Sequence, residues 1–150
     1  FDKLSDYQVG PPSAREILAG LPIAFEYEIE SILRKDSLDM DETDQQKVRS
    51  VVEQETCDRI LITHGTDRMV ETAKALLGIS GKVIVLTGAM EPANFRSSDA
   101  VFNIGVAIGA LNVLPFGVYL AMNGRVFDPL YCRKNRSRHM FEDTREEGQS

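Results

Sequence analysis

The turn at Thr63–Asp67 combines residue types that can do chemistry on a hydroxyl group. It follows an apolar run and ends in Thr66 and Asp67, which place a hydroxyl beside a carboxylate. The next apolar run begins with Lys82, so an amine is carried on the following unit of the chain. A neutral hydroxyl is a weak nucleophile and needs a base or a neighbour that lowers its pKa. A lysine can be that base only when it is neutral.

The elements around this turn indicate an α/β fold. Apolar runs predict strands, and longer stretches with an apolar stripe predict helices. Strands are predicted at Arg59–Thr63, Val83–Leu86 and Val118–Met122, and helices at Arg68–Leu77 and from Asp99 to Leu111. This alternation predicts a largely parallel sheet with helices on both faces. Ligands of such sheets bind at the carboxyl ends of the strands, where Thr66 and Asp67 lie.

The remaining segments complete this prediction. Ser13 and Glu16 form a capping-box pattern that predicts a short helix, and a longer helix is expected from about Thr43 to Gln54. Alternating apolar residues over Ile23–Ile29 predict another strand. Asn123-Gly124 is a strong hairpin signal after the strand at Val118. The polar tail from Glu142 to Ser150 is expected to be frayed.

Several ordered motifs resemble the bacterial-type L-asparaginase family. They are Tyr7–Gly10, Ser37–Met40, His64–Asp67, Lys82 with Gly88–Met90, and Ser98-Asp99. The resemblance runs from about Tyr7 to Tyr119. It implies a flavodoxin- or Rossmann-like sheet, and it makes residues 1–150 one asparaginase N-terminal-type domain.

The resemblance also implies an activity, namely conversion of L-asparagine to L-aspartate and ammonia through a threonine acyl-enzyme. Thr66 would position or activate the attacking group, and Lys82 would relay its proton. Asp67 would bind the substrate's α-amino group, completing a Thr66–Lys82–Asp67 relay. Tyr7 would close over the substrate and assist the nucleophile. No metal or organic cofactor is implied.

Further residues would bind the substrate by the same resemblance. Ser37 would hold the α-carboxylate with backbone N–H groups near Gly65 and Thr66, and Leu38 and Ala89 would also contact the substrate. A pocket of this kind prefers asparagine to glutamine, but one methylene is worth only ~1–3 kcal/mol. Minor glutaminase activity is therefore expected.

Each candidate also has a purely structural interpretation. Thr66 or Asp67 could simply cap the helix that follows. Lys82 could be a solvated lysine at a strand start, Ser37 a turn residue and Tyr7 a packing residue. His64 is interpreted as orienting the turn rather than as catalytic. The order of the whole set, not any single member, favours the functional interpretation.

The sequence departs from the family pattern in several places. The family's Thr-Gly-Gly-Thr-Ile turn, which carries its primary nucleophile, occurs nowhere in these 150 residues. That turn and the first strand are expected upstream of Phe1, and the family's smaller C-terminal domain is absent from this sequence. Leu38 stands where many relatives have a polar residue that touches the substrate, Arg68 where a threonine is common, and Glu91 where an arginine is common. We expect these changes to weaken substrate binding.

Amino-acid composition and net charge indicate which classes of binding partner are unfavourable for this protein. Hydrophobic content of 43% and charged content of 27% are typical of a soluble globular protein. The net charge of −6 argues against nucleic-acid or anionic-membrane partners, which favour basic surfaces. The short basic segment Arg133–Arg138 is interpreted as solvated or as part of an interface. No apolar run approaches the ~20 residues of a membrane span.

Cysteine usage favours the cytoplasm, and a homo-oligomer, a dimer or a tetramer, is expected because it would cover the face that the family's C-terminal domain otherwise occupies. Cys57 and Cys132 are interpreted as reduced, buried thiols rather than as a disulfide, and the two histidines are too few and isolated for a metal site. Besides a remote flavodoxin-like regulator, for which no acidic phosphorylation pocket or phosphate loop is evident, two alternatives to the hydrolase remain open. One is a non-catalytic amino-acid-binding module that keeps Asp67 and Ser37. The other is an amidotransferase relative that supplies ammonia for charging transfer RNA, which the acidic balance and the lack of an RNA-contacting domain disfavour.

Overall fold

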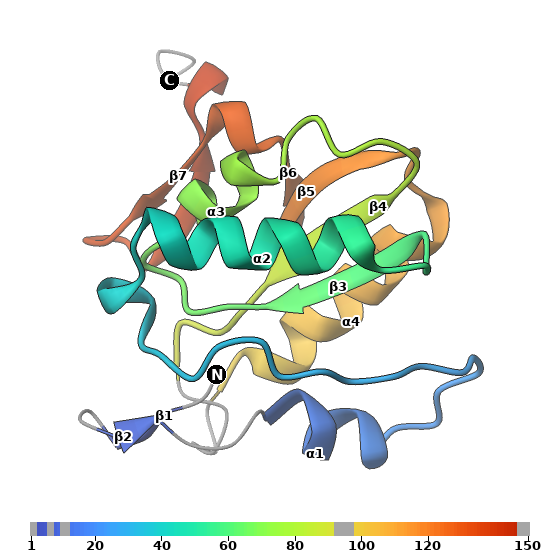
Figure 1. Ribbon diagram of the computed structural model, residues 1–150. Coiled ribbons are helices and arrows are strands. Elements are labelled where there is room, and N and C mark those ends of the chain that lie inside the picture. Colours follow the sequence, from blue (N-terminus) through green and yellow to red (C-terminus); the bar gives the residue numbers. More distant parts are fainter. Residues whose placement is uncertain (1–2, 6–7, 10–12, 92–97, 147–150) are drawn as a thin grey trace.

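A four-stranded sheet forms the centre of the molecule. The computed structural model describes residues 3–5, 8–9, 13–91 and 98–146. Its sheet has the order β3 (Arg59–Thr63), β4 (Val83–Thr87), β5 (Gly117–Met122) and β6 (Arg125–Phe127), as seen in Figure 1. The first three strands are parallel and β6 is antiparallel. The predicted strands and the mostly parallel sheet are therefore confirmed.

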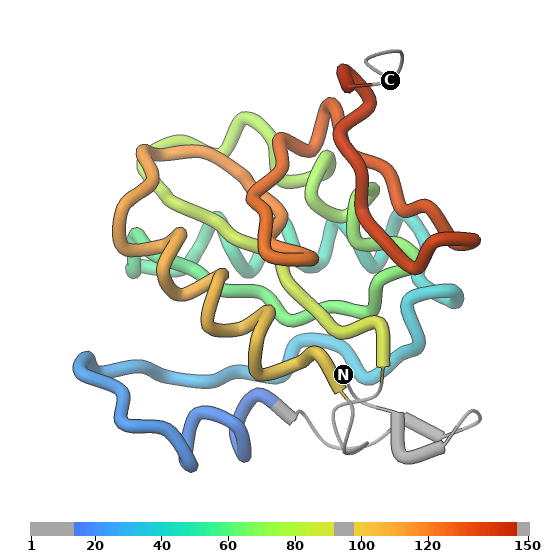
Figure 2. The backbone as a smooth tube through the Cα atoms, turned by 180° about the vertical axis from the view of Figure 1, so that it is seen from behind, coloured from blue at the N-terminus to red at the C-terminus, as the bar shows by residue number. Residues whose placement is uncertain are grey.

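Helices cover both faces of this sheet. Helices α2 (Glu42–Gln54) and α3 (Met69–Ala75) lie on one face, and α4 (Ala100–Val113) crosses the other, as the two opposite views show (Figures 1 and 2). Side chains of β4 alternate between the two layers. Ile84 and Leu86 pack with the α2 and α3 cluster, whereas Val83 and Val85 pack with alanines of α4. A strand covered on both faces must be apolar throughout, which explains the run of buried residues in β4.

The carboxyl-terminal part consists of two hairpins. Asn123 and Gly124 both have positive φ, 55° and 76°, which suits the tight turn that joins β5 to β6 and confirms the predicted hairpin. A 3-10 helix, η2 (Pro129–Tyr131), leads to the hairpin of β7 (Cys132–Asn135) and β8 (Met140–Asp143).

The expected fraying from Glu142 is wrong for residues 142–146. Glu142 and Asp143 belong to β8, and residues 144–146 form the 3-10 helix η3 (Thr144–Glu146). The segment is polar because its carboxylates form ion pairs, with Glu142 contacting Arg133 and Asp143 contacting Arg145. Polarity here reflects these pairs rather than disorder.

The amino-terminal part differs from the prediction in one element. The short strands β1 (Lys3–Ser5) and β2 (Gln8–Val9) pair with each other, and α1 (Ser13–Ala19) follows as predicted. The predicted strand over Ile23–Ile29 is wrong, because no strand among the described residues pairs with it. Its chain is nevertheless extended, and residues 22–36 run beside β3 in both views (Figures 1 and 2). Ile23 and Ile29 pack against the cluster of Leu18 and Ile104. The alternating apolar residues therefore reflect the burial of one side of the segment and not backbone pairing with a strand.

Within the described ranges, no helix has the length and apolar character needed to cross a bilayer.

Candidate active site

The turn after β3 is held by His64. Its backbone N–H donates to the carbonyl oxygen of Thr87, 2.9 Å away, which extends the contact with β4 beyond the strand ends. The His64 ring bridges Gly65 and Thr72, with Nδ1 2.6 Å from the Gly65 carbonyl oxygen and Nε2 2.8 Å from Thr72 Oγ1. A carbonyl oxygen only accepts, so Nδ1 donates to Gly65, and Nε2 shares the second hydrogen bond with the Thr72 hydroxyl. The ring thereby ties the turn to α3, in keeping with the structural role interpreted from the sequence.

Two glycines allow three segments of the chain to meet at this turn. A Cβ atom at Gly65 would lie 2.5 Å from Ser37 Oγ, and one at Gly88 would overlap the carbonyl oxygen of His64. Ser37 is buried at the start of the 3-10 helix η1 (Ser37–Asp39). The structure therefore brings Ser37 and Gly65 into contact, because glycine lacks the side chain that would keep them apart.

The structure describes two of the other substrate-binding candidates, Ala89 and Leu38. Ala89 follows Gly88, and its side chain is buried in the apolar cluster with Leu18, Ala100 and Ile104. Leu38 is 50% exposed on η1. Tyr7 lies outside the described residues.

Thr66 and Asp67 share one partner that the sequence analysis did not assign. Lys134 Nζ, reaching in from β7, donates to Thr66 Oγ1 at 2.7 Å and to Asp67 Oδ1 at 2.8 Å. The Lys134 and Asp67 side chains are only 16% and 20% exposed. Charge-assisted hydrogen bonds in such a partly desolvated place are stronger than they are in water. Arg136 Nη2 also contacts Asp67 Oδ1, at 3.0 Å, from a far more exposed position.

These contacts correct the expectation that Thr66 or Asp67 caps the following helix. The N-cap residue of α3 is Arg68, and no side-chain hydrogen bond caps it. The oxygens of Thr66 and Asp67 are instead bound by Lys134.

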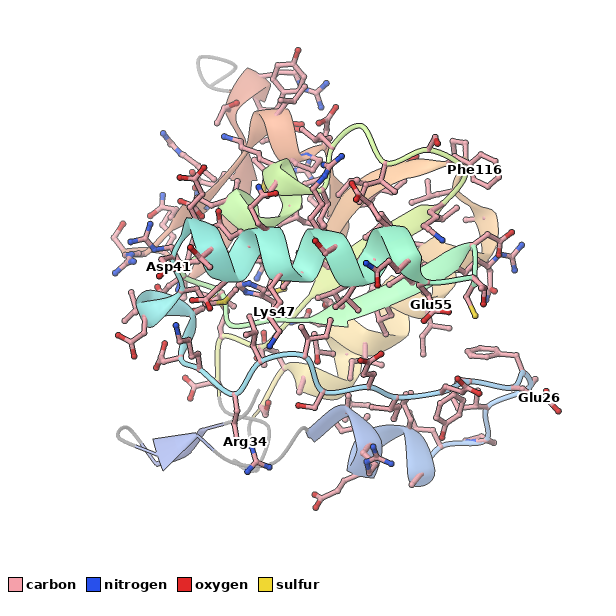
Figure 3. The ribbon with its side chains drawn as sticks, in the orientation of Figure 1. Glu26, Arg34, Asp41, Lys47, Glu55 and Phe116 are labelled. Carbon is pink, nitrogen blue, oxygen red and sulfur yellow. The ribbon has the colours of Figure 1, made fainter. Side chains whose placement is uncertain are left out.

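The predicted relay through Lys82 is wrong on geometric grounds. Lys82 Nζ donates to the carbonyl oxygens of Glu55 and of Cys57, the latter at 2.8 Å. Asp41 and Glu55 mark the two ends of α2 (Figure 3), and η1, which contacts the turn at Gly65, lies just before Asp41. A 13-residue helix is roughly 20 Å long. Lys82 therefore binds carbonyls beyond one end of α2, whereas the Thr66 turn lies near the other.

Lys134 could have been found from the sequence. It belongs to the basic segment Arg133–Arg138, which was interpreted as solvated or as an interface. Side chains two positions apart on a strand share a face. Cys132 is buried, so Lys134 points to the same inner side, while Arg133 points outward and pairs with Glu142. Alternation along β7 was thus the missed signal.

Ion pairs stiffen the hairpin that carries Lys134. Hydrogen bonds from Asn135 and Arg133 lower the pKa of Glu142 below its usual value. Arg145 lowers the pKa of Asp143 to about 2 by its side-chain and backbone hydrogen bonds. Both carboxylates lie on β8 and are ionised at neutral pH. The basic segment is therefore largely committed to ion pairs inside the hairpin and at Asp67.

The described residues indicate neither cysteine chemistry nor metal binding at this candidate site. Both cysteines are free, as interpreted, although Cys57 is exposed and only Cys132 is buried. Burial raises the pKa of the Cys132 thiol to about 12, so it is not a ready nucleophile. Among residues 13–91 and 98–146, no group of histidine, cysteine and carboxylate side chains could hold a metal ion.

Comparison with known proteins agrees with the resemblance drawn from the motifs. The family model described as "Asparaginase, N-terminal" matches residues 4–145. The chain is 42% identical over 73 residues to a subunit of the glutamyl-tRNA(Gln) amidotransferase of Methanococcus vannielii, a match that covers 47% of this chain and 17% of the relative. It is 35% identical over 103 residues to a glutaminase-asparaginase of Acinetobacter glutaminasificans, covering 65% of this chain and 30% of the relative.

A glutaminase-asparaginase of Pseudomonas aeruginosa is 31% identical over 107 residues, covering 68% of this chain and 28% of that protein. The chain thus spans less than a third of the length of each of these relatives. A match over 4–145, together with a parallel α/β sheet and a Thr66–Asp67 turn at its strand ends, leads to one conclusion: the chain belongs to the asparaginase family, within the N-terminal domain of that family.

Proposed function

We propose that this domain forms part of an amidohydrolase site that converts L-asparagine to L-aspartate and ammonia, with Lys134 in the place first given to Lys82. The observation that carries the proposal is the contact of Lys134 with both Thr66 and Asp67 at the carboxyl end of β3. Open α/β sheets bind their ligands at this edge. The chain matches the N-terminal domain of the asparaginase family, and this membership supports an amide substrate.

In the proposed reaction a threonine hydroxyl attacks the side-chain amide carbon. The C–N bond breaks, the nitrogen leaves as ammonia after gaining a proton, and water then hydrolyses the resulting ester to a carboxylate. Lys134 Nζ occupies a lone pair of Thr66 Oγ1, so the Thr66 proton is directed toward another acceptor. When neutral, an amine at this 2.7 Å distance can instead take up the proton. Thr66 would in this way position or activate the attacking group.

Substrate binding is assigned to residues that surround the same turn. Ser37 Oγ, buried beside Gly65, is the proposed partner of the α-carboxylate, together with backbone N–H groups of the turn. Asp67 is the proposed partner of the α-ammonium group. Leu38 and Ala89 would contact the substrate, and Tyr7 would close over it. Glutamine is longer than asparagine by one methylene, which a pocket discriminates against only weakly, so minor glutaminase activity is expected.

A second candidate function is ammonia supply within an amidotransferase. The observation that favours it is the 42% identity to relatives named as subunits of glutamyl-tRNA(Gln) amidotransferases, compared with 31% and 35% to the glutaminase-asparaginases. Both functions would use the same amide hydrolysis at Thr66 and differ in what consumes the ammonia. The net charge of −6 is unfavourable for direct contact with RNA.

Ammonia release from L-asparagine and from L-glutamine tests the proposal. The full chain would be compared with Thr66→Val and Lys134→Met, and with Arg138→Ala as a control on the same hairpin whose ion pair is with Glu142. Loss of a proton-transfer group costs typically 10²–10⁴-fold, so both site variants should lose about that much and the control little. Unchanged release in both site variants would refute the assigned geometry.

A chain that binds L-asparagine through Asp67 without releasing ammonia would instead be the non-catalytic binding module. Calorimetric titration of L-asparagine into the full chain and into Asp67→Asn separates this outcome from a chain that does not recognise the amino acid.

A further inference from the structure

The carboxylate of Asp67 is shared by two cations of the chain itself. Lys134 Nζ lies 2.8 Å and Arg136 Nη2 lies 3.0 Å from the same oxygen, Oδ1. One negative charge thus faces two positive charges at this point. A third cation brought to Asp67 would be repelled by both, because like charges within a few ångströms disfavour one another.

The two cations are held very differently. The Lys134 side chain is 16% exposed and also binds Thr66, so it is part of the buried framework of the site. The Arg136 side chain is 68% exposed and approaches Asp67 from solvent. Exposed ion pairs contribute little to stability, so the guanidinium can leave at small cost. Arg136 is therefore the cation that an incoming group would displace.

We propose that Arg136 is a specificity-determining residue that competes with the substrate's α-ammonium group for Asp67. The inference rests on the proposed function, because it takes Asp67 as the partner of that ammonium group. A substrate with an ammonium group must displace Arg136, whereas an amide of the same acid without that charge need not. The surplus positive charge also attracts the carboxylate that both kinds of substrate carry. Arg136 should therefore lower the preference of the site for L-asparagine over the same monoamide without its amino group.

The neighbouring arginine offers a matched control. Arg138 lies on the same hairpin, is 67% exposed, and forms an ion pair of the same 3.0 Å length, but with Glu142. Removing it changes the net charge of the hairpin as much as removing Arg136 does. Any effect that Arg136 alone produces must therefore come from Asp67 and not from the overall charge.

The test compares L-asparagine with succinamate, which is asparagine without its α-amino group. In Arg136→Ala and Arg136→Gln, the ratio of kcat/KM for L-asparagine to that for succinamate should rise about threefold or more, a size typical of a surface ion pair. The change should come mainly from a lower KM for L-asparagine. Arg138→Ala should leave the ratio unchanged. A ratio that does not move in either Arg136 variant, or that moves equally in Arg138→Ala, overturns the inference.

A binding measurement separates this inference from the proposed activity. Calorimetric titration with L-aspartate and with succinate needs no turnover, and circular dichroism confirms that each variant is folded. If no protein releases ammonia, the proposed activity fails, but tighter L-aspartate binding relative to succinate in the Arg136 variants still supports the competition. An unchanged relative affinity, or no binding of either ligand by any of the proteins, overturns it.

Discussion

At the scale of single residues, two lysines of this chain have opposite roles. Lys134 contacts the side-chain oxygens of Thr66 and Asp67, where chemistry is proposed. Lys82 contacts the backbone carbonyls of Glu55 and Cys57, just beyond the last turn of α2. A cation at the carboxyl end of a helix satisfies carbonyl groups that have no partner within the helix. Lys82 is therefore a stabilising residue.

Replacing each lysine by methionine should separate these roles. Lys134→Met should lower kcat/KM for ammonia release by about 10²-fold or more, because the Thr66 hydroxyl loses its proton partner. Lys82→Met should leave activity largely intact well below the unfolding midpoint. It should lower the free energy of unfolding by about 1–3 kcal/mol, because two carbonyls lose their donor. Initial rates and urea unfolding of both variants measure the two effects. A Lys82→Met protein of full stability and no activity would contradict this division.

The error over Lys82 had a physical reason that the sequence already contained. Thr66 follows the end of β3, whereas Lys82 precedes the start of β4. Because the two strands are parallel, Thr66 lies at the carboxyl ends of the strands and Lys82 at their amino ends. The motifs named Ser37 and Gly65 as members of one site, and the structure shows them in contact. Lys134 lies 68 positions from Thr66. To predict their contact, one must recognise that Arg133–Arg138 contains a strand and that Lys134 is on its inward face.

At the scale of elements, glycines fill two different needs. Gly88 lets the end of β4 approach the turn, where a methyl group would meet the His64 carbonyl oxygen and lie 2.7 Å from Met69 Cε. Gly105 lies in the middle of α4 with nothing within 4 Å of the place where a Cβ atom would be. One glycine is required by a close approach, and the other only lowers the helix propensity.

Alanine at these two positions should therefore shift stability in opposite directions. Gly88→Ala should lower the free energy of unfolding by about 1–3 kcal/mol through overpacking. Gly105→Ala should raise it by about 0.5–1 kcal/mol, because alanine loses less backbone entropy in a helix. Thermal unfolding followed by circular dichroism measures both. A stabilising Gly88→Ala would show that the turn and β4 are not in the close contact described.

The hairpin of β7 and β8 should make stability depend on acid pH. Arg145 lowers the pKa of Asp143 to about 2 in the folded state, below its usual value of 3.8. A carboxyl group of this kind stabilises the fold above its unfolded pKa, and the contribution is lost as the pH falls through the folded pKa. Stability should thus decline between about pH 4 and pH 2. Asp143→Asn should flatten that decline in urea unfolding measured across this range, and an unchanged decline would exclude Asp143 as a cause.

At the scale of the whole molecule, the sheet has one fully covered centre and one open side. Strand β4 is buried along its whole length, between β3 and β5, whereas β3 is only partly buried. Residues 22–36 run beside β3, but no strand in the described part of the chain pairs with that edge (Figure 2). The apolar run of β4 predicted this strand correctly, because a strand covered on both faces is apolar at every position. Local sequence patterns could not show whether the extended segment at Ile23–Ile29 has a hydrogen-bonded neighbour, since that depends on which chain lies beside it.

Amide hydrogen exchange should reveal this arrangement strand by strand. The His64 N–H points to Thr87, and successive N–H groups of a strand alternate in direction, so those of Ile60 and Ile62 also point toward β4. The N–H groups of Leu61 and Thr63 point to the other edge. We expect slow exchange for Ile60 and Ile62, fast exchange for Leu61 and Thr63, and slow exchange along all of β4, which has neighbours on both sides. Exchange followed by NMR on the full chain tests each amide separately. Equal protection of all four β3 amides would mean that another strand covers this edge in solution, from the same molecule or from a second copy.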